Sequence, residues 1–228
     1  AHATKDEAAI ERIRKDLRQA EWAQGDLVGE VNEMARFEGI VIPLRDEKGR
    51  VHSLQIRLDY PPDDKDKYRF FSSPKKGARA GARAHVPLNC GLKTEKVRFV
   101  EGAFKADLTT VRTGELCISY SSATAWRQTL PLIKELGVKT AVLPLDADVR
   151  TNVSVGSAMG RFACQLASQE MDFEIESWDP KCGKGIDDVI AADHKKEIVV
   201  RSHRDAWLFV ENFLKTSGAK ANPEVVVN

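Results

Sequence analysis

Residues 97–103, Val-Arg-Phe-Val-Glu-Gly-Ala, are the stretch that decides the fold. The apolar run predicts a short buried strand that carries Glu101 to its carboxyl end, and the glycine after it allows a tight turn into a helix. Residues 141–148, Ala-Val-Leu-Pro-Leu-Asp-Ala-Asp, repeat this pattern and end in Asp146 and Asp148. Because open α/β sheets form their sites at the carboxyl ends of parallel strands, we expect these three carboxylates to converge.

Converging carboxylates indicate a divalent metal site. Hard oxygen ligands of this kind favour Mg²⁺ or Mn²⁺, held partly by water and by substrate phosphates. Such an ion polarises a phosphoryl group and stabilises the charge that develops in the transition state. An acid at a strand end can instead cap the helix that follows. Capping is the better explanation for any one of the three acids, whereas the three together favour a metal site.

Strands and helices alternate along the chain from residue 97 onward. Strands are expected at residues 97–100, 115–120, 138–145 and 173–178, with helices between them. This alternation predicts a parallel sheet with right-handed crossovers. Upstream, residues 39–44 and 51–58 predict an antiparallel pair of strands. The expected fold is therefore a parallel α/β sheet flanked by helices and preceded by a smaller, strand-rich α+β subdomain.

Three segments are expected along the chain. An N-terminal basic α+β subdomain spans residues 1–93 and opens with a predicted helix at residues 5–24. The α/β domain spans residues 94–200, and a C-terminal helix and tail occupy residues 201–228. Because the chain opens at Ala1 in a charged stretch, we expect a fragment of a longer protein.

Composition narrows the class of protein. The 228 residues carry a net charge of +1 and 42% hydrophobic residues, which is typical of a soluble globular protein. The four cysteines form no CxxC pair, which argues against a zinc ribbon, and free thiols fit a reducing compartment. The sequence has neither an apolar run of transmembrane length nor a signal peptide, so we expect a cytoplasmic protein with no membrane partner.

A glycine-rich basic loop follows the predicted strand at residues 68–73. It spans residues 75–85 and suits contacts with phosphates, although a solvated surface loop explains the same charges equally well. Tyr68 stands close to these cations, and aromatic rings interleaved with cations can stack on bases.

These motifs resemble a known family. A strand followed by Glu-Gly, and later a strand followed by Asp-x-Asp, is similar to the signature of Toprim domains. Lys67-Tyr68 and the Ser-Ser-Pro at residues 72–74 resemble the amino-terminal half of the bacterial primase polymerase core. Glu-Gly-Ala-Phe-Lys-Ala-Asp at residues 101–107 and Gly-Lys-Gly-Ile-Asp-Asp at residues 183–188 resemble primase domains of plasmid and phage replication proteins. The resemblance covers about residues 37–193.

The resemblance implies a Toprim-type fold and a primase activity. The expected protein is a metal-dependent nucleotidyltransferase core that makes primers on a single-stranded DNA template from nucleoside triphosphates during DNA replication of mobile elements. Mg²⁺ or Mn²⁺ is the implied cofactor, and a helicase domain or protein is an implied partner. Two alternatives stay open: a Toprim nuclease that cleaves phosphodiesters, and a non-catalytic nucleic-acid-binding Toprim module.

The resemblance also assigns roles to single residues. Glu101, Asp146 and Asp148 are expected to be catalytic and to bind metal, and Asp187 and Asp188 are expected to add metal ligands. The residues expected to bind nucleic acid or nucleotides are Arg57, Lys67, Tyr68, Lys75, Lys76, Arg79, Arg83, Lys105 and Lys184.

Two positions depart from the bacterial primase pattern. Lys105 stands where those enzymes carry an aspartate, four residues after the motif glutamate, and Gly185 stands in the place of a second aspartate. Two carboxylates of the fuller cluster are therefore missing. We expect one good metal site instead of several, with Lys105 contacting phosphate.

Overall fold

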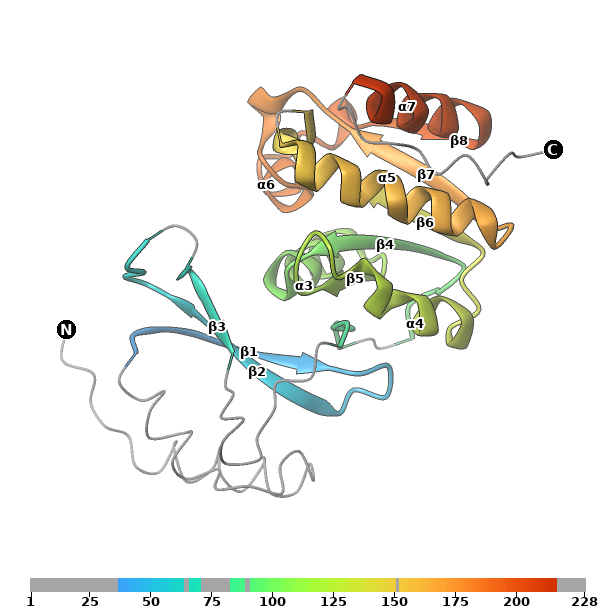
Figure 1. Ribbon diagram of the computed structural model, residues 1–228. Helices are drawn as coiled ribbons and strands as arrows, with labels where there is room; N and C mark the ends of the chain where they lie inside the picture. The colour runs from blue at the N-terminus through green and yellow to red at the C-terminus, as the bar shows by residue number, and fades with distance from the viewer. Residues whose placement is uncertain (1–36, 64–65, 71–82, 89–90, 151, 217–228) are drawn as a thin grey trace. The chain divides into compact units, whose positions relative to one another are not determined.

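The computed structural model describes residues 37–63, 66–70, 83–88, 91–150 and 152–216, and the chain divides into two compact units, Ala1–Ala82 and Arg83–Asn228 (Figure 1). The helix expected at residues 5–24 and most of the basic loop at 75–85 lie outside the described residues. The domain boundaries expected from the sequence stay predictions.

The first unit contains an antiparallel sheet in the order β1-β2-β3, formed by β1 (Gly39–Arg45), β2 (Val51–Leu58) and β3 (Tyr68–Phe70). Asp46 organises the turn between the first two strands. Its carboxylate accepts hydrogen bonds from the backbone amides of Lys48 (3.0 Å) and Arg50 (2.9 Å) and from Nε of Arg50 (2.8 Å). Burial opposes the charge, but these hydrogen bonds outweigh it and lower the pKa of Asp46 below 3.8.

The second unit contains a five-stranded sheet in the order β5-β4-β6-β7-β8. Its strands are β4 (Lys96–Glu101), β5 (Cys117–Tyr120), β6 (Thr140–Pro144), β7 (Asp172–Ser177) and β8 (Val199–Ser202). The first four are parallel, as the alternation predicts, and β8 pairs antiparallel with β7. The predicted α/β class, a mostly parallel sheet preceded by a smaller strand-rich unit, is confirmed.

Helices of the second unit pack into two apolar clusters. The helices are α3 (Ala103–Thr113), α4 (Leu130–Glu135), α5 (Val153–Ser168), α6 (Ile186–Ala191) and α7 (His203–Thr216). Val97 and Phe99 of β4 pack in one cluster with α4, α5 and α7, where Phe162 stacks on Trp126 with 5.0 Å between ring centroids. Val100 packs in the other cluster with α3 and α6. Strand β4 is therefore buried on both faces, as its apolar run predicts.

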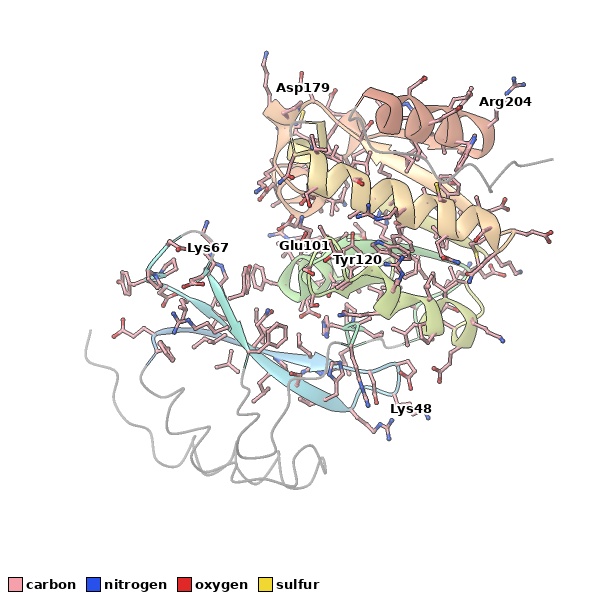
Figure 2. The ribbon with its side chains drawn as sticks, viewed as in Figure 1. Lys48, Lys67, Glu101, Tyr120, Asp179 and Arg204 are labelled. Carbon is pink, nitrogen blue, oxygen red and sulfur yellow. The ribbon has the colours of Figure 1, made fainter. Side chains whose placement is uncertain are left out.

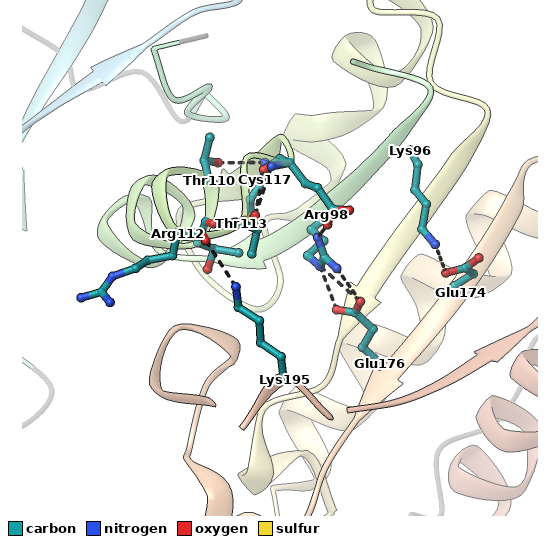
Figure 3. Close-up of polar contacts among 11 residues, drawn as sticks. Lys96, Arg98, Thr110, Arg112, Thr113, Cys117, Glu174, Glu176 and Lys195 are labelled. Atoms are coloured by element: carbon teal, nitrogen blue, oxygen red, sulfur yellow. Dashed lines mark hydrogen bonds and ion pairs between the residues drawn. The ribbon is translucent and has the colours of Figure 1, made fainter. Parts of the chain in front are cut away.

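A buried ion pair crosses this sheet (Figure 3). Arg98 of β4 reaches over β6 to Glu176 of β7, with Nη2–Oε1 at 2.8 Å and Nε–Oε2 at 3.0 Å. Arg98 also contacts Glu115. Burial opposes the guanidinium charge, but Glu176 and then Glu115 outweigh that effect and raise the pKa of Arg98.

Within the part of the chain that the structure describes, no helix combines the length and apolar character needed to cross a membrane.

Candidate active site

The site begins where β4 ends at Glu101, whose side chain is exposed. The next residue, Gly102, has φ 92°, a conformation that favours glycine, and its amide donates to the carbonyl of Tyr120 (3.0 Å). This turn leads directly into α3 and places Lys105 in its first turn. Glu101 and Tyr120 are register partners on neighbouring strands, and Figure 2 shows them at the same end of the sheet.

Asp146 enters the site from the adjacent strand. It follows β6 by two residues, and both its oxygens accept hydrogen bonds from Nζ of Lys105, at 2.7 Å for Oδ1 and 2.6 Å for Oδ2. The pair is largely withdrawn from solvent, because the Lys105 side chain is 16% exposed and that of Asp146 25%. Lys105 therefore pairs with a site carboxylate.

A third segment, the loop before α6, closes over this pair. Nε1 of Trp178 donates to the carbonyl of Gly183 (2.9 Å), and the amide of Ala147 donates to the carbonyl of Lys184 (2.8 Å). These bonds tie the loop to the residues that follow β7 and β6. The loop thereby brings Gly185 against Lys105.

Gly185 has no room for a side chain. A Cβ at this position would lie 2.8 Å from Nζ of Lys105 and 2.5 Å from Oδ1 of Asp187. Real Cβ atoms essentially never approach heavy atoms within 3.0 Å. The lysine head and the Asp187 carboxylate therefore fill the space that a side chain at position 185 would use.

The two acids of α6 have different surroundings. Oδ2 of Asp188 accepts hydrogen bonds from the amides of Lys184 (3.2 Å) and Gly185 (3.0 Å), which is the arrangement of a helix cap. Oδ1 of Asp187 is buried and has no hydrogen-bond partner among the described residues. Burial raises the pKa of Asp187, and the nearby charge of Lys105 only partly offsets this effect.

The electrostatics of the site keep Lys105 charged. Burial alone would lower the pKa of this amine, but Asp146, followed by Asp187 and Glu101, outweighs it and raises the pKa. One ammonium thus lies within the influence of three carboxylates.

The predicted site residues separate into groups. Glu101, Lys105, Asp146 and Asp187 come together in the second unit, with Asp188 and Lys184 in the adjacent loop and helix turn. Asp148 lies in the 3₁₀ helix η4 (Ala147–Arg150), and its side chain is not among those described.

The other residues predicted to bind nucleic acid belong to both units or fall outside the described residues. In the first unit, half-buried Arg57 is the register partner of exposed Tyr68, and the carbonyl of exposed Lys67 accepts from the amide of Leu58 (2.8 Å). Arg83 is exposed at the start of the second unit. Lys75, Lys76 and Arg79 lie outside the described residues.

The donor set decides how many metal ions the site can hold. Among the described side chains, which leave out Asp148, no group of three His, Cys, Asp or Glu residues is arranged to hold a metal. Both oxygens of Asp146 already accept from Lys105, whereas Oδ1 of Asp187 is a buried oxygen without a partner, which suits a hard cation. A divalent ion beside Lys105 would therefore be held partly by water or substrate phosphates, and the described carboxylates do not supply enough oxygens for several ions.

Sequence reasoning placed His85 in the basic loop and did not foresee its buried contact with α3. Its ring is buried and its Nε2 lies 3.0 Å from Oδ1 of Asp107, two residues beyond Lys105 on α3. His85 also forms backbone bonds with Ser119 beside β5. It therefore anchors α3, the helix that carries Lys105. The sequence signal for this contact was Asp107, the last residue of the motif at residues 101–107.

Comparisons with known proteins identify the fold. A family model described as a domain of unknown function, DUF3854, matches residues 96–197, and no curated protein matches the chain. Similar solved structures include the DnaG primase catalytic domain bound to ssDNA (TM-score 0.53, 16% identity, 89% of this chain and 62% of that chain). They also include the E. coli primase catalytic core (TM-score 0.54, 14% identity, 79% of this chain and 56% of that chain). Another is the Aquifex aeolicus primase with its zinc-binding and RNA polymerase domains (TM-score 0.51, 15% identity, 81% of this chain and 48% of that chain). The chain spans less than two thirds of each of these chains, and at these identities the likeness shows a primase-core fold.

Proposed function

We propose that this chain is a Toprim primase core, a nucleotidyltransferase that makes primers on single-stranded DNA from nucleoside triphosphates with Mg²⁺ or Mn²⁺. One observation carries the proposal. In a fold like that of primase catalytic cores, Glu101, Asp146, Asp187 and Lys105 meet where two parallel strands end. Carboxylates and a cation at such an edge suit a reaction that develops charge on phosphoryl oxygens.

Each residue has a defined role in this proposal. Glu101 acts as a metal ligand or general base, because its side chain is exposed at the strand end. Asp148 and Asp187 would be further ligands of a bound ion, and Asp146 would be a ligand while it also holds Lys105. A bound divalent ion supplies Lewis-acid polarisation of the phosphoryl group. Asp188 supports the site by capping α6.

The basic residues hold the nucleic acid and the nucleotide. Arg57 and Lys67 would contact phosphates, and Tyr68 would stack on a base. Further phosphate contacts are proposed for Lys75, Lys76, Arg79, Arg83 and Lys184. The setting in plasmid, phage or other mobile-element replication, and a helicase partner, rest on the motif resemblance and are part of the proposal.

The test is primer synthesis by Asp146→Asn on single-stranded DNA, with ribo- and deoxynucleotides in turn. Asparagine keeps an acceptor for Lys105, whereas alanine would leave a buried ammonium without its partner. We expect synthesis to fall by about 100-fold or more, because the carboxylate that would hold the cations for the reacting phosphate loses its charge. Asp193→Asn is the matched control, since Asp193 is exposed with φ 60°, which asparagine accepts readily.

Product length separates the alternatives. Full synthesis by Asp146→Asn would refute the assignment, and shortened DNA in place of new primers would indicate a nuclease. The engagement of both Asp146 oxygens by Lys105 favours a second candidate, a nucleic-acid-binding module without catalysis. In that case the wild-type chain binds single-stranded DNA but incorporates no nucleotide.

A further inference from the structure

Lys105 holds Asp146 in the manner of a bound cation. Its ammonium contacts both carboxylate oxygens, at 2.7 and 2.6 Å, which are the short distances of charge-assisted hydrogen bonds. The side chain is largely buried, so solvent screens this attraction only weakly. A lysine ammonium is a compact point charge, as a metal ion is.

The space for this ammonium exists because residue 185 is glycine. Nζ of Lys105 lies 2.8 Å, and Oδ1 of Asp187 2.5 Å, from the point that a Cβ would occupy there. The two departures from the primase pattern, Lys105 and Gly185, are therefore one structural feature. A long basic side chain from α3 fills the place of a side chain from the loop before α6.

Charge around the lysine supports the same conclusion. Asp146, Asp187 and Glu101 all act on the ammonium. When ionised, these three carboxylates and the one ammonium leave two negative charges, before Asp148, whose side chain is not described, is counted. Without the lysine the same carboxylates would leave three negative charges, and both oxygens of Asp146 would be available to a second ion.

We propose that the Lys105 ammonium is a built-in cation of this centre, held by Asp146 beside Asp187 in the place of one divalent ion. The centre then takes one divalent ion fewer than its carboxylates would take without the lysine. The inference rests on the proposed function only in assuming that the centre uses divalent ions.

The test counts Mn²⁺ ions bound to the full chain by electron paramagnetic resonance titration at fixed ionic strength. Lys105→Met keeps the length of the side chain and removes its charge, and we expect it to bind one more Mn²⁺ per chain than the wild type. Lys139→Met is the matched control, because Lys139 pairs with Glu95 at 2.8 Å on an exposed surface, and its count should equal that of the wild type.

A second variant reaches the same position without removing the lysine. In Gly185→Ala the new Cβ meets both the lysine head and Oδ1 of Asp187, so both must shift, and we expect the additional Mn²⁺ once the ammonium has moved off Asp146. Circular dichroism shows whether each variant is folded. If Lys105→Met does not fold, the Mn²⁺ count of Gly185→Ala provides the test. An unchanged Mn²⁺ count in a folded variant would overturn the inference. If the wild type makes no primers but the Mn²⁺ count of the variant changes as predicted, the proposed function is wrong and the inference about Lys105 stands.

Discussion

Replacing Arg98 by methionine should destabilise the second unit strongly. The variant removes the guanidinium that crosses the sheet from β4 to Glu176 of β7. The Arg98 side chain is 14% exposed and that of Glu176 only 3%, so Glu176 would remain as a buried charge without its partner. Glu115, whose side chain is 58% exposed, can turn to solvent and contributes little.

The structure sets the magnitude of this loss. Removing one partner of a buried ion pair lowers the free energy of unfolding by about 3–5 kcal/mol, because the remaining charge stays desolvated. Replacing both partners by apolar residues of similar volume is often neutral, because no charge is left behind. The double variant Arg98→Met/Glu176→Met should therefore recover most of the stability lost in Arg98→Met.

The assay is urea unfolding of the full chain, followed by tryptophan fluorescence. Three of the four tryptophans, Trp126, Trp178 and Trp207, lie in the second unit. The variant Lys139→Met, which breaks an exposed pair, serves as a control and should lose less than about 1 kcal/mol. A loss below about 1 kcal/mol in Arg98→Met, or no recovery in the double variant, would refute the reasoning.

Two further predictions concern single carboxylates. Asp46→Asn should lower stability at neutral pH, because the folded-state pKa of Asp46 lies below 3.8 and its stabilisation is fully present above that value. As the pH falls through the folded-state pKa the wild type loses this stabilisation, so the difference between the two chains in unfolding free energy should shrink on acidification; a difference that stays constant from neutral to acid pH would contradict this. Asp188→Ala should lower the free energy of unfolding by about 1 kcal/mol, because it removes the cap of α6. It should leave the Mn²⁺ count unchanged, and a lost ion would identify Asp188 as a ligand.

The fold could be predicted because its signals are local. Strands β4 and β6 are apolar runs buried on both faces, and each ends in an acid, so their position in a parallel sheet follows from the sequence. Strand β8 was missed, because Val199 and Val200 lie half exposed on a short edge strand and show no alternation. The helix expected between the strands at residues 115–120 and 138–145 is divided into a 3₁₀ turn and α4, with Pro131 at the start of α4.

The site could be predicted only in part. The meeting of Glu101 and Asp146 follows from sheet topology, since the ends of neighbouring parallel strands share one edge, whereas Asp187 of α6 was expected there only from the family resemblance. The partner of Lys105 could not be predicted from the sequence, because a lysine four residues after a glutamate has equally good access to phosphate or to a carboxylate. Arg98 and Glu176 are 78 residues apart and became partners only when β4, β6 and β7 had been placed in order.

The close approach at Gly185 also constrains how such a centre can evolve. While Lys105 and Asp187 hold their present positions, a Cβ at position 185 meets the heads of both, so a side chain there requires both to move. Replacing the lysine removes only one of the two contacts, because Oδ1 of Asp187 lies 2.5 Å from the same point. The residue that position 185 can carry is therefore coupled to positions 105 and 187 together.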